Sequence, residues 1–149
     1  MSVSQKCQYA LRAAFELAKR RGQGATTIAE IAAVQEIPPK FLELILNELR
    51  QGGFVESRRG ARGGYMLSSD PSSLFAGDII RFVDGPVAPV GCVERGANED
   101  CPLRHQCAFM DMWRRARDAV ADVYDTTSLE DLIEAERASA EAHSPSYCI

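Results

Sequence analysis

Three cysteines stand close together in the second half of the chain: Cys92, Cys101 and Cys107 fall within sixteen residues. Thiolates are the usual protein ligands of iron–sulfur clusters and also bind zinc, and two neighbouring thiols can form a reversible disulfide. The gaps of eight and five residues match neither the spacing of zinc ribbons nor that of ferredoxins. The pattern indicates a metal-binding or redox-active segment and leaves cluster, zinc and disulfide chemistry open.

A second group with chemical potential is the basic run RRGARGG at residues 58–64. It separates two short segments of strand character, residues 54–57 and 65–67, and its glycines permit a tight hairpin. A basic turn is most often only a solvated run of charge. On a hairpin that follows a helix-turn-helix, however, arginines form a wing that can hold phosphates or enter a minor groove.

The segments before the hairpin supply that helix-turn-helix. Apolar spacing predicts a helix over residues 4–21, stopped by Gly22. Thr27 and Glu30 form a capping box that opens a short second helix. The proline pair at residues 38–39 breaks the chain, and a third helix to Gly52 carries one apolar stripe: Leu42, Ile45, Leu46 and Leu49. Any helical hairpin shares this pattern, and the basic hairpin behind it favours DNA binding.

Two motifs, one in the third predicted helix and one in the basic hairpin, carry a resemblance to a known family. Residues 37–49, IPPKFLELILNEL, and 60–67, GARGGYML, closely resemble the winged-helix regulators that include IscR, NsrR and RirA, and the likeness extends from KCQYA at residues 6–10 over nearly the whole chain. It implies that the third helix enters the major groove while the wing contacts the backbone or minor groove. Glu43 is then the base-reading residue, since a carboxylate can accept a hydrogen bond from cytosine N4. The other candidate DNA contacts are Tyr9, Lys40, Asn47, Arg58, Arg59 and Arg62.

The second half of the chain is predicted to hold three more helices. These cover residues 72–84, 102–125 and 128–141, with a loop over residues 86–100. The long helix has apolar residues at spacings of three and four: Phe109, Trp113, Ala116, Val120, Val123 and Tyr124. Such a stripe covers either the core of its own domain or a second copy of the chain. The resemblance favours a homodimer that reads a palindromic operator in double-stranded DNA.

The resemblance also implies that Cys92, Cys101 and Cys107 hold an iron–sulfur cluster, either 2Fe–2S or 4Fe–4S. This chain departs from the family in its first gap, which is eight residues where five are common. The alternative is the same DNA-binding dimer controlled by a thiol–disulfide or zinc switch without a cluster.

The fourth ligand of such a cluster is open. IscR-like members carry a histidine three residues after the last cysteine, where this chain has Met110. Other members supply an acidic residue from the partner subunit, and the corresponding position here is Gln8, a weak ligand. His105 within the loop and Cys7 beside Gln8 are the other candidates.

Charge is divided between the two halves of the chain. The net charge of −4 combines +4 over residues 1–69 with −8 over residues 70–149, an asymmetry expected when one end meets a polyanion. With 46% hydrophobic and 26% charged residues, the composition excludes a disordered or collagen-like chain.

Targeting and catalytic motifs are not found in the sequence. No stretch approaches eighteen apolar residues and the N-terminus lacks the pattern of a signal peptide, so the expected compartment is the cytoplasm and no membrane is expected as a partner. There is no glycine-rich phosphate loop and no nucleophile elbow, and the chain has two histidines. An enzyme is therefore not expected.

The expected fold is mainly α: a winged helix-turn-helix DNA-binding domain with a long C-terminal dimerisation helix. The predicted division is residues 1–85 for the DNA-binding domain, 86–107 for the cysteine-containing sensor loop, 108–141 for the dimerisation helix and the helix after it, and 142–149 for a loose tail.

Overall fold

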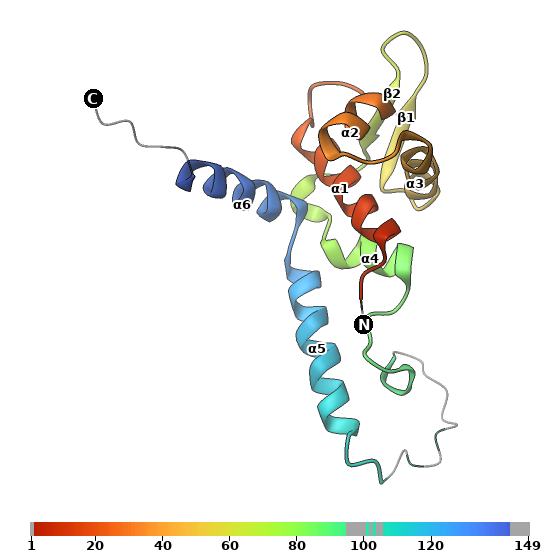
Figure 1. Ribbon diagram of the computed structural model, residues 1–149, viewed down its shortest axis with the longest axis vertical. Helices are drawn as coiled ribbons and strands as arrows, with labels where there is room; N and C mark the ends of the chain where they lie inside the picture. Colours follow the sequence, from red (N-terminus) through yellow and green to blue (C-terminus); the bar gives the residue numbers. More distant parts are fainter. Residues whose placement is uncertain (1, 95–100, 102, 104–105, 144–149) are drawn as a thin grey trace, which may run out of the picture.

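The computed structural model describes residues 2–94, 101, 103 and 106–143. Within them it has six α-helices and one two-stranded antiparallel sheet, so the mainly helical fold is confirmed (Figure 1). The elements follow in the order α1 (Gln5–Lys19), α2 (Ile28–Gln35), α3 (Pro39–Gln51), β1 (Val55–Arg58), β2 (Gly64–Leu67), η1 (Pro71–Ser73), α4 (Ala76–Asp84), η2 (Gly91–Val93), α5 (Met110–Thr126) and α6 (Leu129–Ala142).

The first two helices begin at the polar caps that the sequence supplies. Ser4 caps α1, and its hydroxyl accepts a hydrogen bond from the Cys7 amide at 3.1 Å. The predicted capping box at α2 is present: the Thr27 amide donates to the Glu30 carboxylate at 2.8 Å, and the Glu30 amide donates to the Thr27 hydroxyl at 3.3 Å. Pro39 occupies the first turn of α3, where its missing amide costs no hydrogen bond.

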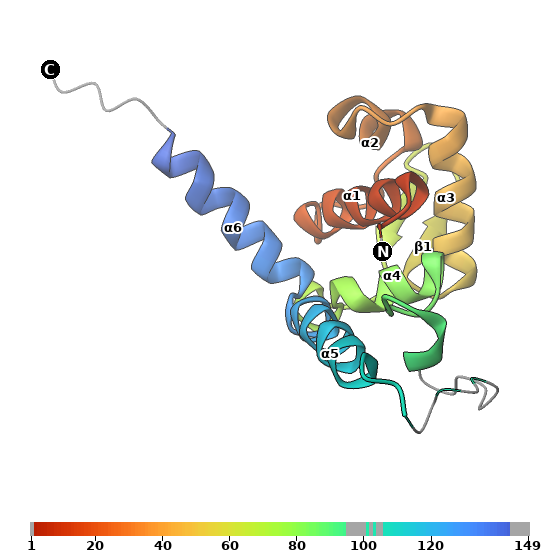
Figure 2. The same ribbon diagram turned by 60° about the horizontal axis from the view of Figure 1, so that its bottom comes forward.

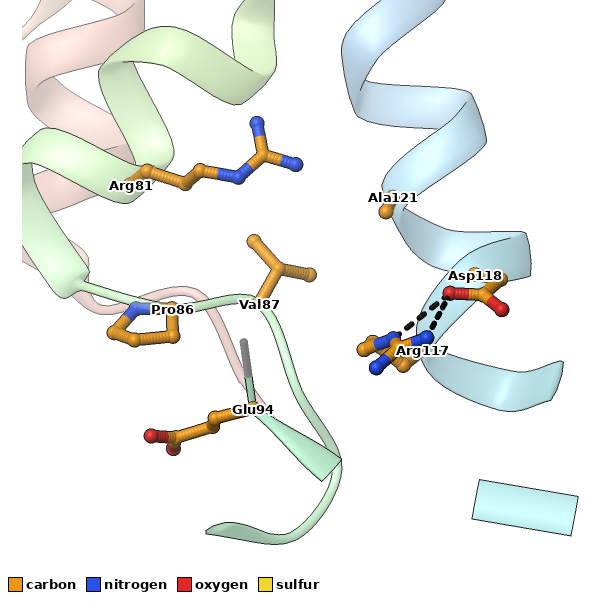
Figure 3. A pocket seen from close by; sticks show the side chains of 7 residues that line it. All are labelled: Arg81, Pro86, Val87, Glu94, Arg117, Asp118 and Ala121. Carbon is orange, nitrogen blue, oxygen red and sulfur yellow. Dashed lines mark hydrogen bonds and ion pairs between the residues drawn. The ribbon is translucent and has the colours of Figure 1, made fainter. Parts of the chain in front are cut away.

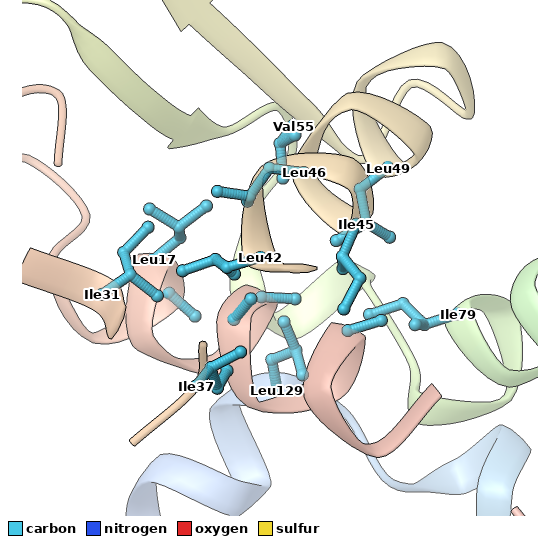
Figure 4. Packing of buried hydrophobic residues seen from close by; sticks show 14 of the residues in the cluster. Leu17, Ile31, Ile37, Leu42, Ile45, Leu46, Leu49, Val55, Ile79 and Leu129 are labelled. Atoms are coloured by element: carbon cyan, nitrogen blue, oxygen red, sulfur yellow. The ribbon is translucent and has the colours of Figure 1, made fainter. Parts of the chain in front are cut away.

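The hydrophobic core lies between α1, α2, α3 and the elements that close over them (Figure 4). The predicted stripe of α3 is buried, with exposures of 0–1%. Leu129 and Ile133 from the start of α6 join the same core, although they are far away in the sequence. The central side chains of this core are Leu17, Ile31, Ile37, Leu42, Ile45, Leu46, Leu49, Val55, Ile79 and Leu129.

The predicted hairpin forms, with Val55 opposite Leu67 and Arg58 opposite Gly64. Its second strand is also fastened to the start of α2, because Thr26 and Tyr65 exchange two backbone hydrogen bonds of 2.9 and 2.8 Å. Gly64 makes this approach possible. Its φ of +151° is unfavourable for a side chain, and a Cβ there would collide with the Thr26 carbonyl.

The helix predicted over residues 72–84 is divided in the structure. A short 3-10 turn, η1, is followed by extended backbone at Leu74 and Phe75 before α4 begins. The extended residues pair with the junction of α5 and α6: the Ala76 amide donates to the Thr127 carbonyl, and the Leu129 amide donates to the Leu74 carbonyl, both at 2.9 Å. This tertiary pairing takes the backbone groups that a continuous helix would have used.

The long helix also begins later than predicted, at Met110 instead of near residue 102. The preceding residues make single turns, with hydrogen bonds from Gln106 to Leu103 at 2.9 Å and from Met110 to Cys107 at 3.2 Å. Met110 is the end of α5 that lies far from the core; the helix runs back toward the core, and α6 then leaves in another direction (Figures 1 and 2). No helix in the described ranges is long and apolar enough to cross a bilayer.

Candidate DNA interface and cysteine segment

The exposed face of α3 carries the predicted base-reading residues. Lys40 and Glu43 are exposed and Asn47 is half-buried, while the opposite face of the helix is locked into the core. The end of α3 is held by polar contacts: Lys6 pairs with Glu48 at 3.1 Å, and Arg50 donates to the Ser57 hydroxyl at 3.3 Å. The helix is therefore presented on a fixed support with its polar side outward.

The turn that sets the angle between α2 and α3 is held from α1. Glu36 ends α2 in the left-handed conformation, at φ 50° and ψ 47°, and is the sole non-glycine residue with positive φ in the described part of the chain. Arg12 donates to the carbonyl of Gln35, the residue before it. The Gln35 amide in turn donates to the Glu16 carboxylate at 3.0 Å, which also accepts from Arg20 at 2.6 Å.

Glu16 is a buried carboxylate that stays ionised in this network. Its side chain is almost fully covered, and burial opposes its ionisation. The hydrogen bonds from Gln35 and Arg20, with the positive charges of Arg20 and Lys19, outweigh that effect and lower the pKa of Glu16. Its charge therefore helps to fix α1 against the helix-turn-helix.

Tyr9 is placed beside the start of α3. Its ring meets the ring of Phe41 edge-on, with the centroids 5.8 Å apart, and the Arg12 guanidinium lies 5.6 Å from the Tyr9 centroid. The Tyr9 hydroxyl accepts a hydrogen bond from the Gln5 amide at 3.1 Å. This predicted DNA contact is thus half-buried and joins α1 to the first turn of α3.

The three wing arginines are all exposed. Arg58 ends β1, and Arg59 and Arg62 lie in the turn that follows. Arg58 and Arg62 line a cleft shared with Thr27 and Glu30 at the start of α2. The wing and α3 lie at the same end of the molecule, so the structure brings the predicted candidates of α3 and the wing to one region (Figure 1).

The cysteines of the sensor segment lie toward the other end. Cys92 is on η2, and Cys92, Cys101 and Cys107 are half-buried free thiols. These thiols are of the type that binds a cluster, and they would supply three of its four usual protein ligands. Among the residues that the structure describes, however, no group of three or more metal-binding side chains lies close enough to hold an ion. His105 and residues 95–100 lie outside the described residues.

Two candidates for a fourth ligand lie on α1. Cys7 is fully buried in a small cluster with Ala76 and Ile80. Burial, followed by the nearby charge of Asp84, raises the pKa of Cys7 to about 12, so this thiol is held in its neutral form, which is a poor ligand. Gln8 is exposed, and its side-chain amide donates to the Val3 carbonyl at 3.1 Å.

The cysteine segment is tied to α5 by one arginine. Arg117 donates to the carbonyl of Val93, next to Cys92, at 2.7 Å, and it pairs with Asp118 at 2.6 Å. These groups border a cleft of about 310 Å³ between the end of α4, the segment after it and α5. Figure 3 shows Arg81 and Arg117 on opposite walls with Val87 between them.

Both arginines of this cleft are balanced by carboxylates of the protein. Arg81 forms two hydrogen bonds to Asp125, at 2.5 and 2.7 Å, which join α4 to the end of α5. Sequence patterns do not identify Arg81 or Arg117, because their partners are set by the tertiary fold. The place of Leu44 on the outer side of α3, in contrast, follows from helical periodicity alone.

Comparison with known proteins agrees with this arrangement. A family model described as Rrf2, iron-dependent transcriptional regulator, matches residues 3–135. The chain is 42% identical over 132 residues to the HTH-type transcriptional regulator CymR of Bacillus subtilis, with 89% of each covered. The solved structure of that protein, titled the global cysteine regulator, superposes with a TM-score of 0.75.

Two further solved structures are similar. IscR from T. potens has a TM-score of 0.73 at 29% identity, covering 97% of this chain and 93% of that one. The oxidized form of CymR from Staphylococcus aureus has a TM-score of 0.69 at 36% identity, covering 89% of this chain and 95% of that one. The matches span 89–97% of the chain, so the similarity is not confined to its DNA-binding half.

Proposed function

Because the chain belongs to the Rrf2 family of transcriptional regulators, we propose that it acts as a homodimer whose affinity for a palindromic operator is controlled by an iron–sulfur cluster on Cys92, Cys101 and Cys107. Family membership already makes the protein a DNA-binding transcription regulator and not an enzyme. The proposal concerns the dimer, the cluster and the residues that link them.

The observation that carries the proposal is the position of the thiols. They lie on the segment that joins α4 of the DNA-binding end to α5, and the Arg117–Val93 hydrogen bond fastens this segment to α5. A bound cluster would supply redox-sensitive iron at this segment. A change in the position of residues near Val93 would then move Arg117 and α5, and with them the spacing of two recognition helices in a dimer.

The proposed dimer rests on the outer face of α5. Phe109, Met112 and Val123 are 62%, 47% and 59% exposed. With Ala116 and Ala119 they occur at alternating spacings of three and four residues, the pattern of a coiled-coil seam, and no residue of α5 is buried. The two alanines at the middle of the seam would allow two copies of α5 to approach closely.

Sedimentation of full-length protein tests the dimer. Met112→Glu places a charge in the seam and is expected to shift the protein to a monomer at micromolar concentration. Arg114→Glu introduces the same charge on another face of α5 and should leave the dimer intact. A parent protein that sediments as a monomer would contradict this part of the proposal.

A second candidate function replaces the cluster with a thiol–disulfide or zinc switch on the same cysteines. The relative at 42% identity is described as a cysteine regulator, and a CymR structure is described as an oxidized form. The thiols of Cys92, Cys101 and Cys107 are all free in the structure. A disulfide would form by loss of two electrons and two protons to an oxidant, and two of the three thiols would disappear together.

Protein purified without oxygen distinguishes the cluster from the zinc site and the disulfide. Such protein is expected to be brown, to absorb at about 400 nm and to contain iron and sulfide together. Cys101→Ala should lose iron and colour and should no longer change its DNA affinity on exposure to oxygen. Cys7→Ala removes a buried thiol and should retain both properties.

Colourless protein from the same preparation would reject the cluster. Bound zinc would then favour a zinc site, and the loss of two titratable thiols on oxidation would favour the disulfide. A cluster that persists in Cys101→Ala would show that Cys101 is not among the ligands.

A further inference from the structure

Leu44 has an unusual position on α3. The buried stripe of this helix is formed by Leu42, Ile45, Leu46 and Leu49, and helical geometry places Leu44 on the opposite side. Its side chain is 66% exposed, which makes it the most exposed of the large apolar side chains that the structure describes. Leu44 therefore contributes little to the core of this chain.

Apart from the half-buried Phe41, the residues around Leu44 on the outer face of α3 are polar. Lys40 lies one turn before it, Asn47 and Gln51 follow on the same side, and Glu43 lies on one flank. The arginines of the wing are at the same end of the molecule, which suits a polyanion. When such a helix lies in a major groove, the residue opposite its buried stripe faces the floor of the groove, where the base edges are.

The chemistry of that floor restricts what Leu44 can contact. The edges of adenine, guanine and cytosine present hydrogen-bond donors and acceptors in the major groove, whereas thymine also presents a C5-methyl group. A leucine side chain cannot form hydrogen bonds, so against a polar edge it would displace water without replacing its hydrogen bonds. Against a methyl group it removes apolar surface from water on both partners.

We propose that Leu44 is a specificity residue that selects a thymine in each half-site of the operator, through contact with the C5-methyl group. This inference rests on DNA binding by α3, but not on the cysteines or on their cofactor. It adds an apolar contact to the hydrogen bond expected of Glu43, and it assigns a base preference to a residue that cannot form hydrogen bonds through its side chain.

Uracil substitution tests the contact, because uracil differs from thymine only by lacking this methyl group. A bound duplex is first selected from a random-sequence library with full-length protein, and each thymine of one half-site is then replaced by uracil in turn. One replacement should weaken binding by the parent protein about fourfold, the change that corresponds to about 0.8 kcal/mol for one buried carbon group.

Variants show whether Leu44 is the residue responsible. Leu44→Ala should bind the thymine and uracil duplexes with equal affinity at that position. Val34→Ala shortens another exposed aliphatic side chain, 54% exposed on α2, and should keep the fourfold difference. Thermal unfolding of Leu44→Ala should match that of the parent because the side chain lies outside the core.

Several outcomes would overturn the inference. If no uracil replacement weakens parent binding, or if Leu44→Ala keeps the full difference, Leu44 does not contact a thymine methyl. A uniform loss of affinity in Leu44→Ala without any methyl dependence has the same meaning and would indicate a contact with the sugar–phosphate backbone instead of a base. If no duplex is enriched at all, DNA binding itself fails, and this result is distinct from the others.

Discussion

The two ends of this molecule are stabilised in different ways. At the DNA-facing end, α3 and its support bury their apolar faces within one chain, and the inner side chains of α3 are 0–1% exposed. At the cysteine end, α5 has seventeen residues and none of them is buried. The proposed DNA-reading surface is thus formed within a single chain, whereas α5 exposes apolar residues that a second copy would cover in the proposed dimer.

The largest difference in stability is expected between shortening a side chain in the core and shortening one on α5. Leu42→Ala should lower the free energy of unfolding by about 2–5 kcal/mol, since it leaves a cavity in the core. Val123→Ala should change the stability of isolated chains by less than about 0.5 kcal/mol. Urea unfolding at several protein concentrations measures the free energy of unfolding of both variants. For Val123→Ala, the way in which this free energy depends on protein concentration should also change. Equal losses from the two variants at low concentration would contradict the contrast.

A smaller loss should follow when the base of the wing is disturbed. Gly64→Ala forces a side chain into a positive φ and against the backbone of Thr26, at an expected cost of about 1–3 kcal/mol. Gly60→Ala also has a positive φ, but no atom lies within 4 Å of its added Cβ, so it should cost less. Calorimetry gives the stabilities, and DNA affinity should fall further for Gly64→Ala than for Gly60→Ala.

At the DNA-facing surface, two variants should weaken binding in different ways. Arg59→Ala should reduce affinity for all duplexes and lower the slope of log affinity against log salt by about 0.9. Glu43→Ala should instead cost selectivity for one base by about 1–3 kcal/mol. Titrations on selected and random duplexes at several salt concentrations distinguish them. Equal losses on both duplexes for Glu43→Ala would remove its assigned role.

The smallest effect on stability is expected when the pH is lowered. Because the pKa of Glu16 is lowered in the folded protein, its contribution to stability is complete above its ordinary pKa and is lost as pH falls through the lower native value. The difference in melting temperature between the parent and Glu16→Gln should therefore be constant near neutral pH and shrink below about pH 4. Glu134→Gln, on the exposed face of α6, controls for the general change in charge.

Local patterns predicted the DNA-facing end well. The cap residues Ser4, Thr27 and Glu30 mark where the first two helices begin, and the spacing from Leu42 to Leu49 identifies the buried side of α3. These signals lie within a few residues of the structure that they specify. The arginine-rich hairpin was predicted for the same reason, because its glycines and flanking strands are neighbours in the chain.

Features that depend on distant contacts were not predicted. The break before α4 arises from pairing with Thr127 and Leu129, about fifty residues away along the chain. Arg117 could be placed on a polar face of α5, but its bond to Val93 depends on how the intervening segment folds. The three thiols are among the described residues and do not form a metal-binding group there, so the cluster that they are proposed to hold is still a prediction.

The short pairing between residues 74–76 and 127–129 holds α5 at one end only, so it can act as a pivot for the helix. It joins α5 to the DNA-facing end by two backbone hydrogen bonds, supported by the Arg81–Asp125 pair. A helix of seventeen residues is about 25 Å long, so a tilt of about 5° at this pivot displaces its far end by about 2 Å. A displacement of atomic size beside Cys107 would therefore correspond to a small rotation of α5 about these two hydrogen bonds.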